Sequence, residues 1–333
     1  MNSVPLSAVL DYFRTEGLLD GFSYDGADFY ITGFAPLDLA SSSEVSFWVG
    51  ACAKNETNAN SFAVKTLSHA RAGLLFVPSK DFGGAKSLFA DARVLLPVEN
   101  PYHAMVLFLK RFAADDACES GVSSTATVHA SAVVEGRVGD NCVVGPGCVV
   151  MRGATLGAGC VLEANVTIYP NVVVGENCVF QAGAVIGSRG FGFYEYRGER
   201  RPVPHLAGVR IGNNCGFGAN TVVAAGFLYP TTIGNDCQFD SLVQIAHNCR
   251  LGNNIYMASQ SAVSGSVVVE DGVEFAGAAK AAGHLTIGKG VRIAAKAGVT
   301  KSVPAGVTVA GFPAEEIAVW RRSMVKLRQM GKK

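Results

Sequence analysis

The chain has 333 residues, about half of them hydrophobic, and its 28 basic and 27 acidic residues nearly cancel. This length and apolar content predict two or three domains with a sizeable core, and the balanced charge gives no reason to expect a nucleic acid as partner. No apolar run reaches the about 18 residues that suggest a membrane span, and the N-terminus lacks the features of a secretory signal. A cytoplasmic location is therefore the default expectation.

Residues 1–115 mix helical and extended patterns without a repeat, which predicts a separate small α/β domain. Helices are expected over Leu6–Glu16 and Pro101–Phe112, and strands over Phe29–Ile31 and Leu74–Val77. The stretch Ala113–Thr127, which contains Asp, Ser and Ala, is expected to link this domain to the rest of the chain.

From Val138 to Val303 the chain follows a six-residue repeat. Every sixth position is apolar in two long runs, from Val138 to Ile186 and from Ile233 to Val299. Six residues suit one short strand and a turn, and three such units make a coil that stacks on the next at a strand spacing of about 4.8 Å. The sequence therefore predicts a mainly β protein, with a parallel β-helix over residues 116–312.

Cysteines and breaks fit the same scheme. Free cysteine packs as a small buried hydrophobe, and no C-x-x-C pair occurs, so we expect structural thiols, no metal site and no cofactor. Two breaks, at residues 188–210 and 224–232, are expected to be loops extruded from the scaffold, where function often lies. Seven of the nine cysteines share one position of the repeat: Cys142, Cys148, Cys160, Cys178, Cys215, Cys237 and Cys249.

A helix is expected over residues 313–333, because Pro313 suits a first helical turn and acidic residues precede basic ones. An apolar stripe runs along it through Ile317, Trp320, Met324 and Leu327. The stripe is expected to pack against the β-helix or a neighbouring subunit. The sharper alternative adds a docking role for an acidic partner to the basic residues Arg321, Arg322, Lys326 and Arg328.

One column of the predicted prism carries candidate chemistry. His247, Gly265 and Gly283 stand one coil apart, and His284 follows the last of them, about 10 Å from His247 at strand spacing. A neutral imidazole can take a proton from an attacking amine or hydroxyl, and the Gly265 N–H could stabilise an oxyanion. Asp240 could orient the imidazole of His247. A lone histidine is more often structural, but the aligned column favours a catalytic interpretation.

Two motifs resemble those of a known family. Asp240–Asn248 (DSLVQIAHN) and Ile186–Phe193 (IGSRGFGF) resemble segments of the UDP-3-O-(3-hydroxyacyl)glucosamine N-acyltransferases, the LpxD family of lipid A assembly. Other segments that match this family are Glu44–Phe47, Gly283-His284, Gly298–Ser302 and Gly311–Ala314. The resemblance extends over essentially the whole chain.

This resemblance implies a left-handed parallel β-helix in a homotrimer whose active sites lie between subunits. It implies that acyl carrier protein delivers a 3-hydroxyacyl group to the 2-amine of UDP-3-O-(3-hydroxyacyl)glucosamine. His247 would be the general base and Gly265 the oxyanion donor. Asp240 would support His247, and His284 would assist near the sugar or phosphate.

The same resemblance implies a substrate site and a carrier site. Phe47 would stack on the uracil, and the further substrate-binding candidates are Gln244, Asn248 and Gly283. The basic residues of the C-terminal helix, Arg321, Arg322, Lys326 and Arg328, would bind the acidic carrier protein.

The chain departs from the family where the nucleotide would bind. Ala224-Ala225 stand where the family has Asp-Arg, and Gly50 and Ala53 stand where it has Asn and Tyr. Two alternatives to the lipid A reaction therefore stay open. One is a divergent member that acylates another amino sugar, and the other is a non-catalytic trimeric scaffold, against which the two histidines argue.

Overall fold

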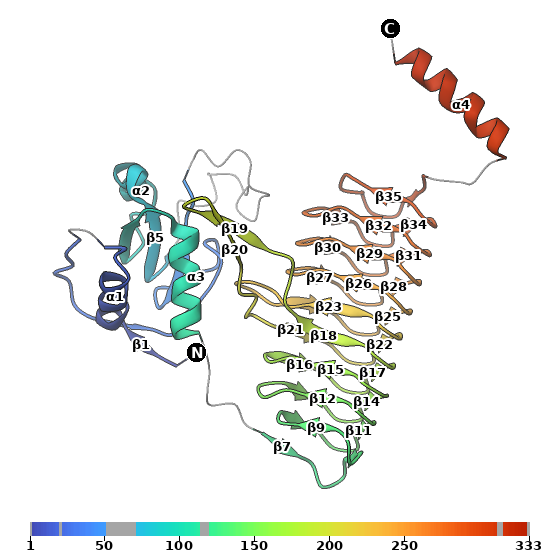
Figure 1. Ribbon diagram of the computed structural model, residues 1–333, viewed down its shortest axis with the longest axis horizontal. Helices are drawn as coiled ribbons and strands as arrows, with labels where there is room; N and C mark the ends of the chain where they lie inside the picture. The colour runs from blue at the N-terminus through green and yellow to red at the C-terminus, as the bar shows by residue number, and fades with distance from the viewer. Residues whose placement is uncertain (1, 20–21, 51–70, 114–119, 312–315, 332–333) are drawn as a thin grey trace.

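The computed structural model describes residues 2–19, 22–50, 71–113, 120–311 and 316–331. It consists of a parallel β-helix, a small α/β unit beside it and a helix beyond its far end (Figure 1). The predicted fold class is therefore confirmed. Within these ranges, no helix combines the length and the apolar content that a membrane crossing needs.

The β-helix extends from β7 (Gly121–Val122) to β36 (Thr308–Val309) as three parallel sheets of nine, ten and nine strands. Most partner strands are one coil apart, as where Val144 pairs with Leu162, 18 positions on. The interior is one continuous column of buried apolar side chains and cysteine thiols. The seven cysteines of the repeat are free and buried, as predicted.

The β-helix begins earlier than the repeat indicates. Val122 pairs with Val138, 16 positions on, so the first coil is two residues shorter than a regular one. A six-residue frame counted back from Val138 therefore misses this coil. The expected linker, Ala113–Thr127, was placed too far along the chain, because its end already forms β7 and the start of β8 (Thr127–Val128).

Both predicted extrusions are present. Val174 pairs with Ile211, 37 positions on, and the inserted chain includes the antiparallel hairpin of β19 (Phe193–Tyr196) and β20 (Glu199–Pro202). Ile211 pairs with Ile233, 22 positions on, so the second insertion is four residues long. The rigid coils on either side keep their register across both insertions.

The N-terminal unit is built on a four-stranded parallel sheet flanked by helices. Its strands, in spatial order, are β3 (Gly33–Phe34), β4 (Glu44–Phe47), β5 (Leu74–Pro78) and β6 (Val94–Val98). The remaining elements are β1 (Val4–Pro5), β2 (Tyr30–Ile31), α1 (Leu6–Thr15), α2 (Phe82–Leu88) and α3 (Pro101–Phe112). The two helices predicted here are found, whereas β3, β4, β6 and α2 were not predicted.

The alternation of side chains along β5 explains the layers of this unit. Leu74 and Phe76 belong to the buried cluster that includes α1 and α3, whereas Leu75 and Val77 belong to the cluster that includes Ala85 of α2. Successive strand residues point to opposite faces, so α1 and α3 cover one face of the sheet and α2 covers the other.

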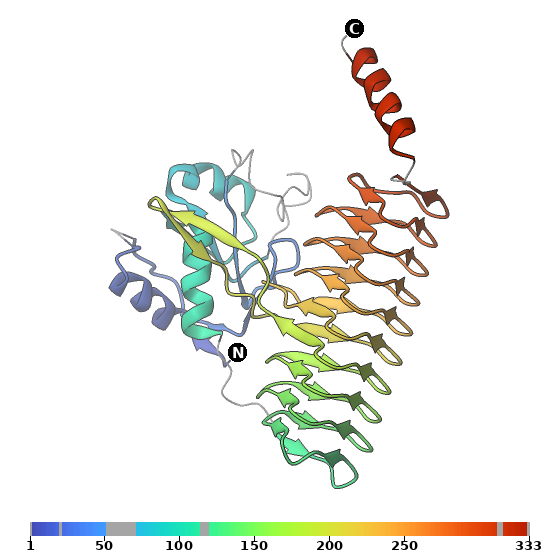
Figure 2. The ribbon, with the colours of Figure 1, turned by 45° about the vertical axis from the view of Figure 1, so that its right-hand side comes forward.

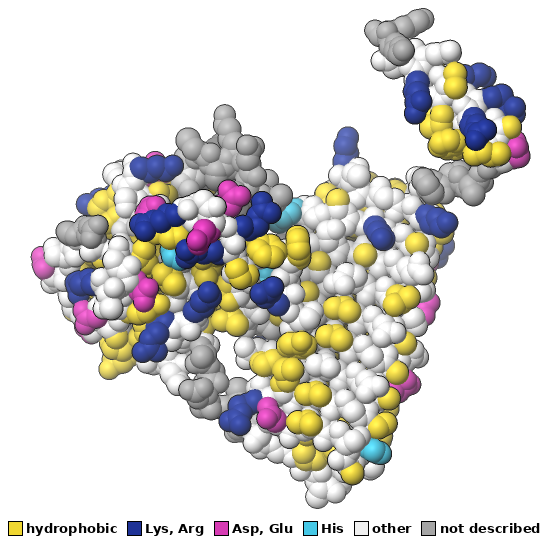
Figure 3. Space-filling view, viewed as in Figure 1, with side chains coloured by type: hydrophobic (Ala, Val, Ile, Leu, Met, Phe, Trp, Pro, Cys, Tyr) yellow, Lys and Arg dark blue, Asp and Glu magenta, His cyan; other side chains and the backbone are white. Residues whose placement is uncertain are grey.

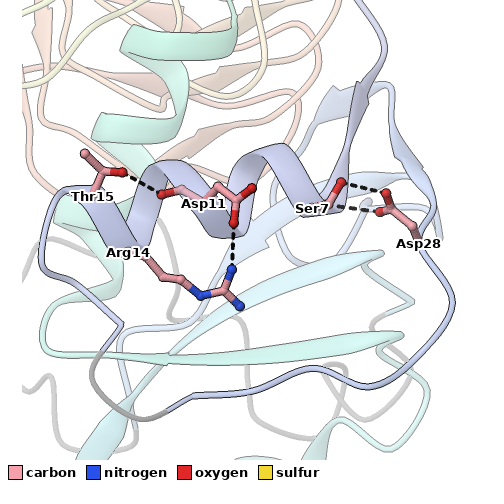
Figure 4. Close-up of polar contacts among 5 residues, drawn as sticks. All are labelled: Ser7, Asp11, Arg14, Thr15 and Asp28. Atoms are coloured by element: carbon pink, nitrogen blue, oxygen red, sulfur yellow. Dashed lines mark hydrogen bonds and ion pairs between the residues drawn. The ribbon is translucent and has the colours of Figure 1, made fainter.

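Asp28 completes the first turn of α1 (Figure 4). Its Oδ2 accepts a hydrogen bond from the Ser7 hydroxyl at 2.7 Å, and its Oδ1 accepts one from the Ser7 backbone N–H at 3.1 Å. These bonds lower the pKa of Asp28 and satisfy one of the free N–H groups at the helix start. Near the other end, Arg14 Nη1 donates to Asp11 Oδ1 at 2.7 Å.

The hairpin β19–β20 fastens the N-terminal unit to the β-helix, and both ribbon views show it lying across α3 (Figures 1 and 2). Arg197 Nη2 lies 2.7 Å from Glu99 Oε2, and the Tyr196 hydroxyl donates to the same carboxylate at 3.2 Å. His103 of α3 stacks on the Tyr196 ring with centroids 3.8 Å apart, and its Nδ1 lies 2.9 Å from the Tyr194 hydroxyl.

His103 makes this contact sensitive to pH. Burial, with the nearby positive charges of Arg201, Lys110 and Arg197, lowers the pKa of His103 from 6.5 to about 4. As the pH falls, His103 is therefore protonated in the unfolded chain before it is protonated in the folded one. The contribution of neutral His103 to the free energy of unfolding is complete above pH 6.5 and is lost as the pH falls from there towards 4. The expected loss at pH 5 is at most about 2 kcal/mol.

Thermal unfolding at pH 7 and pH 5 measures this effect. The wild type should lose more stability between these values than His103→Phe, which cannot titrate. A control substitution at the exposed His129 should behave as the wild type does. Equal losses in the wild type and His103→Phe would contradict the prediction.

Helix α4 (Ile317–Met330) stands apart from the coils (Figures 1 and 3). The Glu316 carboxylate caps it by accepting hydrogen bonds from the backbone N–H groups of the two residues after Ile317. The predicted start, Pro313, lies outside the described residues. No residue of α4 is buried, so the prediction that its apolar stripe packs on the chain's own β-helix is wrong. Packing on a neighbouring subunit stays a prediction.

Candidate active site

His247, Gly265 and Gly283 lie above one another at one corner of the prism. The chain reaches this corner from three stacked strands, β26 (Gln244–Ile245), β29 (Ala262–Val263) and β32 (Lys280–Ala281). Hydrogen bonds join the coils here: Ser266 N donates to His247 O at 3.0 Å, and His284 N donates to Gly265 O at 3.1 Å. The structure therefore brings the predicted column together.

Asn248 sets the tautomer of His247. The Asn248 Nδ2 donates to the Tyr229 carbonyl at 2.8 Å, and its Oδ1 accepts from the Phe227 N–H at 3.2 Å, so the main chain determines the amide orientation. The same Oδ1 lies 3.0 Å from His247 Nδ1. Because this oxygen can only accept, Nδ1 carries the proton and Nε2 keeps its lone pair. That is the form a general base needs.

Gly265 lies against the free edge of the His247 ring. A Cβ atom at Gly265 would be 2.8 Å from both Nε2 and Cε1 of His247. Any residue other than glycine would therefore displace the imidazole ring. In the described part of the chain, the Gly265 N–H makes no hydrogen bond. A free backbone N–H on a residue that lies against an imidazole ring is a candidate donor to an oxyanion formed there.

His284 lies two coils from His247, at the left-handed corner position with φ of 61°. Partial burial and the charge that His247 can carry lower the pKa of His284. It is therefore a neutral imidazole near pH 7. At Gly283, the residue before it, a Cβ would lie 3.1 Å from Gly265 O, which is a tight contact.

The structure adds an imidazole that the sequence pattern did not single out. His205, near the base of the hairpin, has its ring centroid 4.8 Å from that of His247. In the sequence, the sign of a close contact here is the pair of glycines in the first break, Gly190 and Gly192. The structure places both of them close to the His205 ring. No periodicity connects His205 to His247, so spacing arguments cannot find it.

Within one chain, the Asp240 carboxylate bonds to backbone N–H groups and makes no bond to His247. The prediction that Asp240 supports His247 is therefore wrong for a contact inside the chain. Its Oδ1 accepts from Ser241 N at 2.7 Å, and its Oδ2 accepts from Ser259 N at 3.1 Å. Asp240 follows β25 (Gln238–Phe239) and lies at the preceding corner of the prism, because seven residues carry the chain along a whole face. Asn248 is the side chain that holds the imidazole.

Phe47 has no open face for a base in this structure. Its side chain is 6% exposed, and its ring lies edge-on to Tyr102 and Phe227 with centroids 5.0 and 6.3 Å away. Stacking of a uracil on Phe47, as the resemblance implies, would need these rings to move. The phenyl ring instead joins the N-terminal core to the second insertion.

The other predicted substrate residues are dispersed. Gln244 is exposed on the outer face of β26, whereas Ala224 and Ala225 are buried. Gly50 has φ of 96°, and a Cβ there would lie 2.6 Å from Asp81 Oδ2, so the local backbone itself requires glycine. Ala53 lies outside the described residues.

The predicted carrier-binding residues lie on α4, away from the His247 column. All four are exposed, and Figure 3 shows basic side chains on this helix next to hydrophobic ones. They are Arg321, Arg322, Lys326 and Arg328. The chain by itself therefore keeps the column and the basic helix as two separate surfaces.

The coils define a class: this is a hexapeptide-repeat β-helix protein. The family described as bacterial transferase hexapeptide (six repeats) matches residues 135–170 and 153–188. The family described as hexapeptide repeat of succinyl-transferase matches residues 208–239. Within this class, the predicted resemblance to the UDP-3-O-acylglucosamine N-acyltransferases is confirmed.

Relatives with that name come from several organisms. The protein of Caulobacter sp. is 48% identical over 141 residues, which are 42% of each chain. That of Wolinella succinogenes is 36% identical over 170 residues, 51% of this chain and 54% of the relative. A probable mitochondrial member of Arabidopsis thaliana is 36% identical over 157 residues, 47% of this chain and 52% of the relative. The chain thus spans about half the length of the curated relatives it matches.

Among solved structures, the UDP-N-acetylglucosamine acyltransferase of Francisella novicida is similar, with 26% identity and a TM-score of 0.49. The match covers 57% of this chain and 67% of that one.

Proposed function

We propose that this protein is an N-acyltransferase of lipid A assembly. It moves a 3-hydroxyacyl group from acyl carrier protein to the 2-amine of UDP-3-O-(3-hydroxyacyl)glucosamine. The observation that carries this proposal is the tautomer of His247, whose Nδ1–H is held by Asn248 while Gly265, whose own N–H is free, lies close to Nε2. The names of the relatives support the same reaction.

The chemistry follows from this geometry. The amine nitrogen attacks the thioester carbon, and Nε2 of His247 removes a proton from the nitrogen. The carbonyl oxygen becomes negative and accepts the N–H of Gly265. Collapse of the tetrahedral intermediate forms the amide and expels the carrier thiolate, which takes the proton back from His247.

A direct transfer assay tests this function. Purified protein is mixed with 3-hydroxyacyl carrier protein and UDP-3-O-(3-hydroxyacyl)glucosamine, and the diacyl product is detected by mass spectrometry. We expect product with the wild type. A folded protein that forms none would contradict the lipid A reaction, and a panel of other amino sugars would then separate a different acceptor from a non-catalytic scaffold.

Two observations favour a second candidate, a related enzyme that acylates another amino sugar. Phe47 is buried, and the positions where the family holds the nucleotide carry Gly50, Ala224 and Ala225. Under this alternative, UDP-N-acetylglucosamine should bind weakly and Phe47→Ala should not change its affinity. Tight binding that Phe47→Ala abolishes, measured by calorimetry, would exclude the alternative.

We also propose that the protein is a homotrimer, and the exposed apolar stripe of α4 supports this. Trp320 and Leu327 are 47% and 58% exposed in the single chain, and a row of such side chains marks an interaction surface. The proposed trimer would cover this stripe and leave the basic residues free for the carrier protein. Light scattering on the purified protein should give three times the chain mass.

We expect the carrier site on α4 to depend on salt. Attraction between basic side chains and an acidic carrier is screened, so KM for acyl carrier protein should rise steeply between low and physiological salt. The double variant Arg321→Glu with Arg328→Glu should raise this KM about tenfold or more at low salt and flatten the salt response. Arg152→Glu, on an early coil of the β-helix, is the matched control. A flat response in the wild type would remove this role from α4.

A further inference from the structure

We propose that His205 is a positioning residue for His247: its ring supports the flank of the His247 ring and keeps Nε2 in place beside Gly265. The inference rests on the proposed function, in which His247 is the general base. It goes beyond that function by giving the first insertion of the β-helix a part in the active site.

The rings of His205 and His247 are in contact. The two ring centroids are 4.8 Å apart, with the ring planes at 57°. His205 is 8% exposed, and its Nδ1–H donates to the Val203 carbonyl at 3.1 Å, which ties the ring to its own segment. Nε2 of His205 therefore carries no proton.

The His205 ring is uncharged near pH 7. Burial, with the charge that His247 can carry and the positive charge of Arg189, lowers the pKa of His205 to about 4. The ring stays neutral near pH 7, so it can pack beside His247 without a charge that would oppose proton uptake by the base. A lysine or arginine side chain in this place could not do so.

Gly190 lies against the side chains of both histidines, and Gly192 lies against the His205 ring. A Cβ at Gly190 would lie 2.6 Å from His247 Cβ and 2.7 Å from His205 Nε2, and a Cβ at Gly192 would lie 2.8 Å from His205 Cε1. Any side chain at residue 190 would push the rings apart. The segment that contains Gly190 can therefore approach His247 this closely only with glycine at residue 190.

Contact with His205 adds to the other restraints on the His247 ring. Asn248 fixes the tautomer through one hydrogen bond, which restrains the ring only at Nδ1. His205 closes the flank, and the hairpin that follows Gly192 is itself fastened to the N-terminal unit through Arg197 and Glu99. A misplacement of about 1 Å can cost about 10²-fold in rate, so loss of this support should lower kcat rather than raise KM.

Kinetics of single and double variants test the proposal. His205→Ala should lower kcat about 10- to 100-fold with KM changed less than about twofold. His205→Gln, which refills most of the space without charge, should recover most of the loss. In a His247→Ala background, His205→Ala should have no further effect, because a residue that acts through His247 loses its role with it. His129→Ala, at an exposed position outside the site, should match the wild type.

A readout without turnover keeps the test independent of the proposed function. Diethyl pyrocarbonate labels accessible neutral imidazoles, and mass spectrometry assigns the label to each histidine. His247 should be labelled several-fold faster in His205→Ala than in the wild type, whereas His129 should be labelled at the same rate in both. A folded His205→Ala variant, shown by an unchanged circular dichroism spectrum, is the condition for the comparison.

The outcomes separate the two claims. Additive effects of His205→Ala and His247→Ala, or unchanged labelling of His247, would overturn the positioning role even if acyl transfer is observed. No acyl transfer by the wild type would overturn the proposed function, and the labelling rates would still decide whether His205 sets the environment of His247.

Discussion

We expect His247→Ala to lower kcat for acyl transfer by about 10²–10⁴-fold, the usual contribution of a general base. The reason is the tautomer: Asn248 Oδ1 holds the proton on Nδ1, so in the proposed reaction Nε2 would receive the proton of the attacking amine. Alanine leaves no group to take that proton. The measurement is the initial rate of diacyl product formation with saturating acyl carrier protein substrate.

The variant should otherwise resemble the wild type. The His247 side chain is half-buried at a corner of the prism and contributes little to the core, so the unfolding temperature should change only slightly. A loss smaller than tenfold in a well-folded variant would show that His247 is not the general base, and the free N–H of Gly265 would then need another explanation.

Gly265→Ala is the second large effect, with an expected loss of about 10²-fold in kcat. The new Cβ would lie 2.8 Å from Nε2 and Cε1 of His247, which is closer than real Cβ contacts allow. The backbone N–H of residue 265 remains, so the loss reports displacement of the imidazole. KM for either substrate should change much less than kcat.

Gly277→Ala is the matched control for this change. Gly277 also lies in the β-helix, but a Cβ there meets its nearest atom, Ser259 O, at 3.9 Å. This substitution should leave both rate and stability near the wild-type values. Equal activity of Gly265→Ala and wild type would contradict the close contact with His247 and its importance for the reaction.

The repeat explains why so much of the β-helix could be predicted from sequence. When three six-residue units make one coil, the apolar residue of each unit is buried on one face of the prism. The pairing register of the strands can then be found by counting 18 residues along the chain. Counting also placed His247, Gly265 and Gly283 in one column. It failed at the first coil, where Val122 pairs with Val138 across 16 positions, because two missing residues shift the frame.

Prediction was weaker where no period exists. In the N-terminal unit, the helix Pro101–Phe112 carries a clear apolar face and was found, whereas the two-residue β3 carries too short a pattern to recognise. Asp240 was assigned to His247 from sequence proximity, although a face of the prism separates them. Phe47 was assigned to the nucleotide by resemblance, although it packs against Tyr102 and Phe227.

By itself, the sequence determined the β-helix, its column of histidine and glycines, and the positions of both insertions, because each of these follows from a constant coil length. Only the tertiary structure decided how His247 is held. Asn248 is oriented by main-chain atoms of Tyr229 and Phe227 in the second insertion, and His205 arrives from the first. Inserted segments have no period, so their positions depend on packing against the N-terminal unit and the coils, which no local pattern encodes.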